Sequence, residues 1–365
     1  MTFRSRSTRF MLLAALLALA CVGAEWRLRQ LGFWFPPLEL RVPWRSAAED
    51  RAMLTGIHAC ELDPLTLWSP RRGGGAGALS GVNELGGLGE LPPRDRDPGR
   101  ARIALFGDAQ VAGTELAPPE RLSALLRERL SAAGTEVELV AAAVDDFTLA
   151  QGRALWRGRA REWRPDVAIV CFSGRNEFVP ARGAPDLVKL EALATWTGGE
   201  ATFGYRMRLA HLARLAGAAC SGAWIESRES AFVGAQLEMA ASNGSGTFAW
   251  PGKRRMAPPE YRRCFEEWGA ELAQQRTSLV ALAIQAPRGE QPPLPILEGY
   301  ARAAIEAAKA LGATVVDPRA ALGDPVAEWS APGGRLTATG HARVAAALVP
   351  VLLPLLAARR EGSKP

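Results

Sequence analysis

The stretch Ile103-Ala104-Leu105-Phe106-Gly107-Asp108 decides the fold of this chain. Four apolar residues in a row, stopped by Gly-Asp, are typical of a short strand that is buried on both faces and ends at a turn. Apolar runs of the same kind follow at Val137–Val144 and at Val167–Phe172, and the latter ends at Gly174. Runs that are this short and this far apart predict parallel strands joined by crossover connections.

Helical patterns fill the intervals between the apolar runs. The predicted helices run from Pro119 to Ala133, Thr148 to Trp163, Glu260 to Gln275, Leu297 to Leu311 and Thr337 to Ala358, and two more predicted strands lie at Leu279–Ile284 and Thr314–Val316. This alternation predicts an α/β fold with helices on both faces of a parallel sheet. Ligands bind such sheets at the carboxyl ends of the strands, so Gly107-Asp108, the loop after Val144 and Gly174-Arg175-Asn176 should line one crevice.

The residues at these strand ends resemble the GDSL/SGNH hydrolase family, in particular its exported bacterial branch. The similar segments are Ile103–Asp108, Ala141–Val144, Gly174–Glu177 and Pro332–His341, with weaker likeness at Val82–Gly89 and Arg255–Tyr261. The resemblance spans roughly residues 55 to 355. It implies a three-layer α/β/α sandwich with a parallel, flavodoxin-like sheet.

The catalytic positions of that family are not intact here. Ala109 stands where the family has its nucleophilic serine, and Ala143 replaces the glycine that helps to form the oxyanion hole. Pro332 and Arg335 stand at the aspartate and histidine positions. Alanine has no attacking oxygen, and arginine keeps its proton, so neither can do the chemistry. The remaining ligand-binding candidates are Asp108, Gly174, Asn176 and Arg335.

Other side chains near these motifs could replace the lost catalytic groups. Thr114, Ser173 and His341 are the nearest candidates, and Asp108 with Glu177 could form a carboxylate pair. The structural interpretation is favoured for each. We expect His341 at the start of a helix, Asp108 bonded to nearby backbone amides, and Glu177 solvated or paired with Arg175.

Two of the candidate binding residues have open roles. Asn176 either contacts a ligand or ties its loop to neighbouring chain. Arg335 would place a guanidinium where the family has imidazole, which favours a carboxylate, sulfate or phosphate. Alternatively, Arg335 turns outward or pairs with Glu328 or Asp324.

The N-terminus predicts membrane targeting. Arg4, Arg6 and Arg9 precede an uncharged apolar run from Phe10 to Ala24. Positive charge before such a run keeps that end in the cytoplasm and places the rest of the chain outside. The run is shorter than the roughly 20 residues of a spanning helix, so an uncleaved anchor, cleavage after Val22-Gly23-Ala24 and lipidation at Cys21 all stay open.

The predicted organisation has four parts. Residues 1–9 form a basic cytoplasmic flank, 10–24 the anchor or signal segment, 25–100 a juxtamembrane and Gly/Pro-rich connection, and 101–358 the α/β domain. We expect the connection to be irregular and surface-lying, with the charged run at Arg94–Asp97 solvated. We expect residues of about 185–253 to form a cap insertion, with an amphipathic helix at Tyr205–Ala216.

Composition narrows the function further. The net charge of +6 comes almost wholly from arginine spread along the chain, with no basic cluster interleaved with aromatic residues, so nucleic acid is not expected as a partner. Five cysteines without a CxxC pair and only three histidines predict neither a metal site nor a cofactor. Two interpretations remain. One is a membrane-tethered, non-catalytic hydrolase-like protein of the cell envelope that binds an acidic or acylated glycan or a protein partner. The other is an active ester hydrolase or acyltransferase with displaced catalytic residues.

Overall fold

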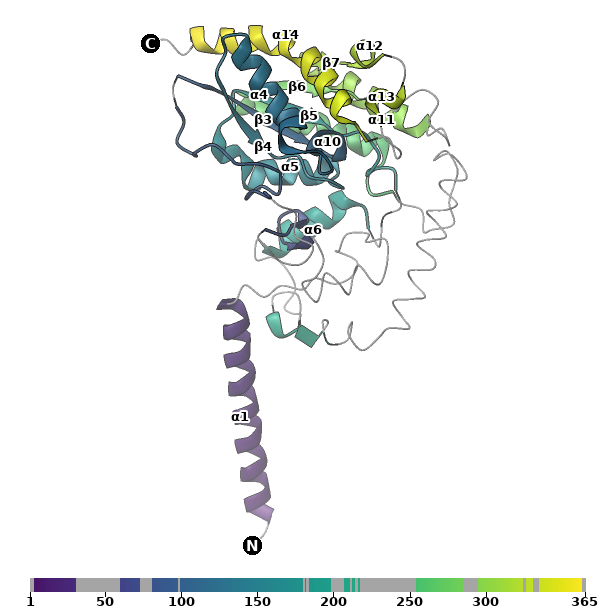
Figure 1. The fold of residues 1–365 in the computed structure, drawn as a ribbon. Coiled ribbons are helices and arrows are strands. Elements are labelled where there is room, and N and C mark those ends of the chain that lie inside the picture. Colours follow the sequence, from purple (N-terminus) through teal and green to yellow (C-terminus); the bar gives the residue numbers. More distant parts are fainter. Residues whose placement is uncertain are drawn as a thin grey trace.

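The central feature of the computed structural model is a five-stranded parallel sheet in the order β4-β3-β5-β6-β7 (Figure 1). The strands are β3 (Ala101–Gly107), β4 (Val137–Ala141), β5 (Val167–Cys171), β6 (Ser278–Leu282) and β7 (Thr314–Val316). Numbered along the chain within this sheet, the order is 2-1-3-4-5, which is flavodoxin-like. The predicted fold class is confirmed.

The structure describes residues 3–30, 60–72, 81–97, 99–179, 181, 184–197, 207–210, 212–213, 216, 254–284, 295–323, 326–330 and 335–362. Pro332, Asp324 and most of the predicted insertion therefore lie outside the described residues. Short elements complete the described chain: α3 (Ala109–Ala112), η2 (Pro118–Glu120), η3 (Ala160–Trp163), α6 (Asp186–Thr197), α12 (Arg319–Leu322) and α13 (Val326–Trp329).

Helices cover both faces of the sheet and make the other two layers. One face packs against α4 (Leu122–Ala132) and α14 (Ala338–Gly362). The opposite face packs against α5 (Leu149–Gly158), α10 (Pro258–Gln274) and α11 (Pro295–Ala310). The five helices predicted between and after the strands are present with ends that shift by a few residues, as expected for helix termini. The one predicted over Thr148–Trp163 is divided into α5 and the 3-10 helix η3.

Successive side chains of each strand point to opposite faces of the sheet, so the protein has two hydrophobic cores, one on each face. In β3, Ile103 and Leu105 join the core under α4 and α14, while Ala104 and Phe106 join the opposite one. Phe106 lies edge-on to Trp268 of α10, with ring centroids 5.1 Å apart. A buried side chain of this size contributes roughly 1.5–3 kcal/mol, which explains why the strands are apolar at every position.

The segment before β3 is part of the domain rather than a surface-lying connection. Strands β1 (Cys60–Asp63) and β2 (Leu67–Pro70) form an antiparallel hairpin that the sequence did not reveal. Asn83 donates its side-chain amide to the carbonyls of Ala141 and Gly89, at 2.9 and 3.1 Å. A Cβ at Gly87 would lie 2.2 Å from the Ala141 oxygen, so only glycine allows this approach to the end of β4.

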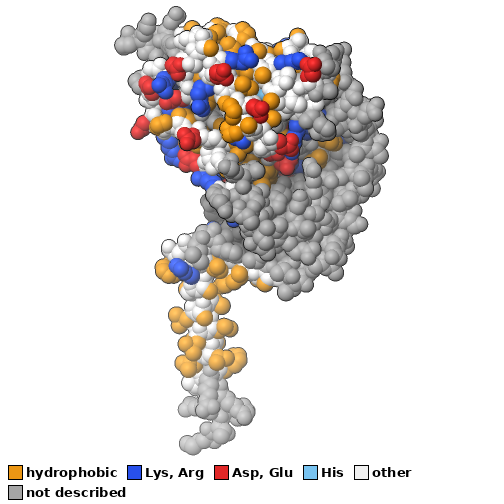
Figure 2. Space-filling view, in the orientation of Figure 1, with side chains coloured by type: hydrophobic (Ala, Val, Ile, Leu, Met, Phe, Trp, Pro, Cys, Tyr) orange, Lys and Arg blue, Asp and Glu red, His pale blue; other side chains and the backbone are white. Residues whose placement is uncertain are grey.

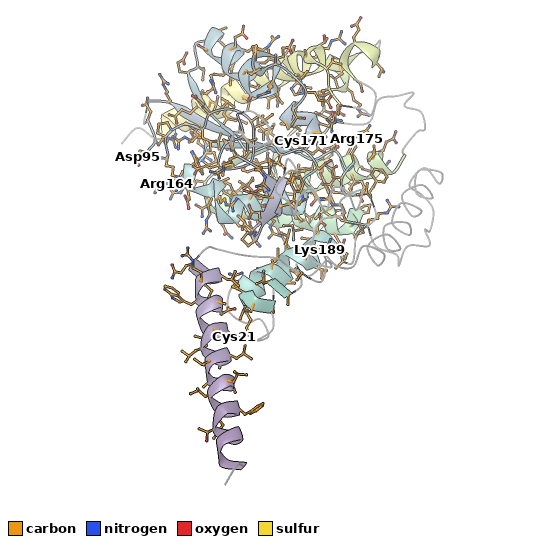
Figure 3. All side chains as sticks on the ribbon, turned by 60° about the horizontal axis from the view of Figure 1, so that its bottom comes forward. Cys21, Asp95, Arg164, Cys171, Arg175 and Lys189 are labelled. Carbon is orange, nitrogen blue, oxygen red and sulfur yellow. The ribbon has the colours of Figure 1, made fainter. Side chains whose placement is uncertain are left out.

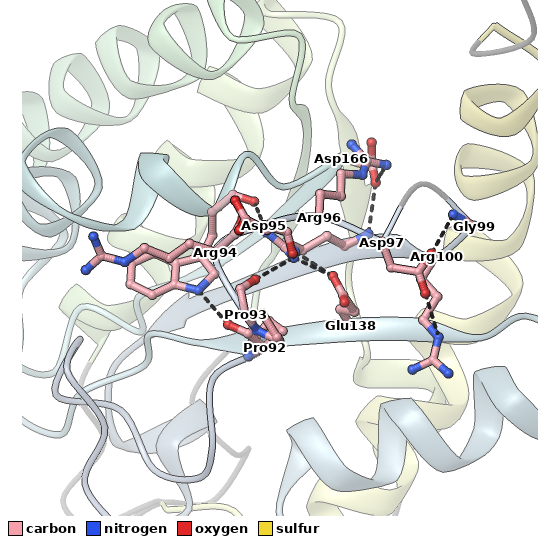
Figure 4. Close-up of polar contacts among 12 residues, drawn as sticks. Pro92, Pro93, Arg94, Asp95, Arg96, Asp97, Gly99, Arg100, Glu138 and Asp166 are labelled. Atoms are coloured by element: carbon pink, nitrogen blue, oxygen red, sulfur yellow. Dashed lines mark hydrogen bonds and ion pairs between the residues drawn. The ribbon is translucent and has the colours of Figure 1, made fainter.

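The charged run at Arg94–Asp97 is exposed, as predicted, and it also makes ion pairs. Arg94 pairs with Glu84 and Glu162, and Arg96 pairs with Asp166 at 2.6 Å. The run wraps around Arg102, whose fully buried guanidinium donates to the carbonyls of Pro93, Arg94 and Trp163 and pairs with Glu138. Figure 4 labels Pro93, Arg94 and Glu138 of this network, together with the pair of Arg96 and Asp166. This network therefore fixes the segment against the amino-terminal edge of the sheet.

The N-terminal apolar run forms the helix α1 (Phe3–Gln30), which projects from the rest of the chain (Figure 1). It is longer than the run Phe10–Ala24 alone, because helical structure continues through the charged residues that follow. Residues Phe10–Gln30 are long and apolar enough to cross a membrane, and apolar side chains cover the helix (Figure 2). Helix α14 meets the same criterion but is partly buried in the core.

Replacing Arg102 by methionine should destabilise the fold by about 3–5 kcal/mol, because Glu138 and three carbonyls would lose a buried donor. The matched control is Arg262→Met. Arg262 pairs with Glu266 and Glu306 on an exposed surface, and such pairs contribute about 0–1 kcal/mol. Denaturant unfolding of the full chain in detergent, followed by tryptophan fluorescence, measures both. Equal losses in the two variants would contradict the role given to Arg102.

Candidate functional site

The candidate site begins with the carboxylate of Asp108, where β3 meets β5. Its Oδ1 accepts the amide of Gln110 at 3.0 Å, and its Oδ2 accepts both the amide and the hydroxyl of Ser173, at 2.9 and 2.6 Å. Burial raises the pKa of Asp108, and these hydrogen bonds oppose that rise. Asp108 thus bonds to backbone amides as predicted, and it links the carboxyl ends of two neighbouring strands.

Gly174 and Asn176 shape the loop after β5. Gly174 has a φ of +83°, and a Cβ there would lie 2.7 Å from the Tyr300 side chain, so both conformation and space require glycine. Asn176 donates its side-chain amide to the carbonyl of Phe147 at 3.0 Å. This contact ties the loop after β5 to the loop after β4, which is one of the two roles expected for Asn176.

The position of Glu177 differs from the prediction that this side chain would be solvated or paired with Arg175. It is fully buried, and its Oε1 accepts the amide of Leu149 at the start of α5, at 2.8 Å. Its Oε2 has no partner among the described residues. Burial, and then the charge of Asp108, raise the pKa of Glu177 to about 8. Glu177 is therefore a neutral, structural side chain at pH 7.

Arg335 is partly exposed to solvent, with a side-chain exposure of 34%, and it does not pair with Glu328. Its guanidinium contacts the carboxylates of Glu115 and Asp145, the latter at 3.1 Å, while Glu328 pairs with Arg343. Asp145 follows β4 and Glu115 follows α3, so Arg335 reaches across the carboxyl end of the sheet. Burial, and then the charge of Asp146, raise the pKa of Asp145 to about 6, while Arg335 opposes that rise.

His341 is a structural histidine in the first turn of α14, as predicted. Its Nδ1 accepts the amide of Leu122 at the start of α4, at 2.9 Å. A nitrogen that accepts an N–H is unprotonated, and burial lowers the pKa of His341 to about 4. The imidazole is fully buried. It therefore joins two helices and is not available as a base.

The two hydroxyl groups that could replace the lost nucleophile, those of Ser173 and Thr114, differ in burial and in bonding partner. The Ser173 hydroxyl is buried and engaged by Asp108. Thr114 donates to Asp145 Oδ2 at 3.3 Å, beside Arg335. Ala109 follows Asp108 as the first residue of α3, and Ala143 is packed in the core under α4 and α14. Within the described residues, no group of three His, Cys, Asp or Glu side chains could hold a metal ion.

Sequence reasoning missed two sets of residues around the crevice. The first set is Asp145 and Glu115, the carboxylates that pair with Arg335. The available sequence signal was the acidic pair Asp145-Asp146 after the apolar run that ends at Val144. The second is the buried ion pair between Arg255 and Asp186, at 2.9 Å. Arg255 also donates to the Gln151 side chain, and Asp186 accepts the hydroxyl of Thr148. Arg255 also donates to the carbonyl of Asp146 at 3.0 Å, which fixes the loop that carries Asp145.

The candidate site thus lies at the carboxyl end of the sheet, opposite the Arg102 network. Figure 3 shows Cys171 and Arg175 toward one end of the sheet and Asp95 and Arg164 at the other. The fold and the strand-end motifs together define an α/β domain of the flavodoxin-like class, with the candidate site where the order of the strands reverses.

Comparisons with known proteins give similar solved structures. A putative GDSL-like lipase from Parabacteroides merdae is 12% identical, with a TM-score of 0.43, over 72% of this chain and 100% of that one. A lipase/acylhydrolase from Enterococcus faecalis is 14% identical, with a TM-score of 0.42, over 69% and 95%. An acetylxylan esterase from Geobacillus stearothermophilus is 12% identical, with a TM-score of 0.42, over 71% and 96%. No protein-family profile and no curated protein matches the chain. Likenesses this distant say nothing of activity.

Replacing Glu177 by glutamine should remove a pH dependence of stability. The pKa of Glu177 rises from 4.5 to about 8 on folding, so its contribution is present below pH 4.5 and is lost as the pH rises through 8. The loss should be about 1.4 kcal/mol per pH unit between about pH 5.5 and 7, and the slope should level off as the pH rises through 8. Glutamine keeps an acceptor for the Leu149 amide but cannot ionise.

Denaturant unfolding at several pH values in this window measures the slope. Glu306→Gln, at an exposed ion pair with Arg262, is the matched control and should keep the wild-type slope. An unchanged slope in Glu177→Gln would show that Glu177 does not carry it.

Proposed function

We propose that this protein is a membrane-tethered, non-catalytic member of the GDSL/SGNH hydrolase family, whose crevice binds an envelope glycan or a protein partner. The observation that carries the proposal is that, among the described residues, the side chains of His341, Asp108 and Arg335 are all engaged by other groups of the protein. His341 bonds to Leu122, Asp108 holds Ser173, and Arg335 is paired with Asp145 and Glu115.

The chemistry supports a non-catalytic role. Acyl transfer on this scaffold needs an oxygen nucleophile, a base and donors for the oxyanion. Ala109 supplies no oxygen, and the imidazole of His341 already accepts a backbone amide. Losing the members of a catalytic triad leaves only binding and oxyanion effects, several orders of magnitude below a working enzyme.

The tether is inferred from the N-terminal helix. Arg4, Arg6 and Arg9 precede the apolar stretch, and moving them across a bilayer is disfavoured. The domain then sits on the outer side of the cytoplasmic membrane, where acidic and acylated glycans are available partners. Active relatives of the branch that the motifs resemble add or remove acyl groups on surface polysaccharides or lipids, which supports this ligand class.

A second candidate function is ester hydrolysis by a displaced catalytic set. The observation in its favour is the Thr114 hydroxyl, which donates to Asp145, a carboxylate whose pKa is about 6, beside the Arg335 cation. In that scheme the Thr114 oxygen attacks the acyl carbon and Asp145 accepts its proton, then returns it to the alcohol as the ester bond breaks. Water, with Asp145 again as base, attacks the acyl-threonine and releases the carboxylic acid, which restores the Thr114 hydroxyl. The O···O distance of 3.3 Å is long for a hydroxyl bond, and Asp145 is already engaged by Arg335. The non-catalytic role is therefore favoured.

The full chain in detergent should not hydrolyse short-chain nitrophenyl esters above background, because nucleophile and base are both absent. Ala109→Ser alone should stay inactive, since a serine without a neighbouring base is a poor nucleophile. Absorbance of released nitrophenol measures turnover. Turnover that disappears in both Thr114→Val and Asp145→Asn would establish the displaced set instead.

Binding of an acidic oligosaccharide should strengthen as the pH falls through 6. Asp145 takes up a proton there, which removes one of the two carboxylates that pair with Arg335 and leaves Glu115 as the other. Asp146, Asp108 and Thr114 are the other groups that face the pair. Asp145→Asn should bind at pH 7.5 as wild type does at pH 5. Arg335→Ala should lose about 1.5–3 kcal/mol of binding free energy, the contribution of a charged hydrogen bond.

Titration calorimetry with acidic and neutral oligosaccharides measures these affinities. Equal binding by wild type and Arg335→Ala would remove Arg335 from the site. No binding of any glycan would leave a protein partner or a purely structural role.

A further inference from the structure

The end of α1 is joined to the insertion by a charged contact. The carboxylate of Glu25 accepts the backbone amides of Arg208 and Leu209, at 2.9 and 2.8 Å, and also pairs with Arg29 at 2.8 Å. Arg208 and Leu209 begin the insertion helix, which we define by its described residues 208–210, 212, 213 and 216. The first amides of a helix have no acceptor within it, and a carboxylate at that end is stabilising. Glu25 therefore caps the insertion helix from a segment 183 residues away.

This contact fixes the level of the insertion helix relative to the apolar part of α1. Glu25 is the residue directly after the uncharged run Phe10–Ala24. It is followed by exposed Trp26, Arg27 and Arg29, a combination that is enriched where a spanning helix leaves the hydrocarbon region. The insertion helix accordingly starts at the height of the lipid headgroups.

The insertion helix presents apolar residues on one side. Leu209, Leu212, Ala213 and Ala216 follow the spacing of a single helical face. Leu212 is 42% exposed, and Ala213 and Ala216 are exposed as well. An apolar helical face at the level of the headgroups, beside arginine side chains, fits the boundary between headgroups and acyl chains of a bilayer.

We propose that the insertion helix is a membrane-surface element, held on the outer end of α1 by Glu25, with its apolar face in the same bilayer. The occupant of this face is the phospholipid membrane, and the inference rests on the proposed membrane tether. It gives α1 a role beyond anchoring. Cleavage after Ala24 would leave Glu25 on the domain but separate it from the apolar run Phe10–Ala24, and so release the insertion helix from the membrane.

The test places a nitroxide label at Leu212→Cys in the full chain, reconstituted into vesicles of phosphatidylcholine and phosphatidylglycerol. Cys21, Cys60 and Cys220 are first replaced by serine, while Cys171 and Cys264 are buried and stay. Electron paramagnetic resonance compares collisions of the label with oxygen, which concentrates in lipid, and with a water-soluble nickel chelate. The matched controls are Leu17→Cys on α1 and Leu311→Cys after α11, which are 67% and 37% exposed.

We expect oxygen to dominate at positions 17 and 212 and nickel to dominate at position 311. Glu25→Ala should shift position 212 to the value of position 311 and leave position 17 unchanged, and Glu25→Gln, which keeps one acceptor, should lie between the two. A water-exposed label at position 212 together with a lipid-exposed label at position 17 would overturn the inference and leave the tether intact. A water-exposed label at position 17 would overturn both.

Discussion

The carboxylate of Asp108 is the contact on which the crevice depends. It joins the end of β3 to the end of β5 by accepting three hydrogen bonds, two of them from Ser173. A fully buried carboxylate is stable only when such donors surround it. The short turn into α3, the position of Ala109 and the glycine conformation after Ser173 all follow from this contact. Asp108 therefore has a structural role at the carboxyl ends of these strands.

Other polar groups of the candidate site are also held by internal contacts, although Glu177 Oε2 and His341 Nε2 have no partner among the described residues. The Leu122 amide occupies His341, and Asp145 and Glu115 neutralise Arg335. A working active site keeps donors and a base free for the reacting group. Here the only ionisable contact that changes near physiological pH and reaches solvent is that of Asp145 with Arg335, among the described residues. In the proposed function, protonation of Asp145 makes the guanidinium more accessible to an anionic ligand.

Polar networks also fix the two ends of the sheet and the segments that flank the domain. Arg102 draws the chain before β3 around the amino-terminal edge, and Arg255 with Asp186 holds the loop that carries Asp145. Buried ion pairs add little stability compared with apolar packing, but breaking one partner is costly. They therefore select one arrangement of long connecting segments. Glu25 does the same at the surface, where it joins α1 to the start of the insertion helix.

The sequence by itself determined the elements of the sheet and its helices. Apolar runs such as Ile103–Phe106, with the helical periods between them, depend only on local patterns of burial. It also determined what is missing, since Ala109 has no oxygen in any fold. Only the tertiary structure decided the partners of charged residues. Arg335 pairs with a residue 220 positions away, Glu177 is buried at the start of α5, and the run at Arg94 wraps around Arg102. A long charged side chain can reach many acceptors, and which one it meets depends on how distant segments come together. No local pattern contains that information.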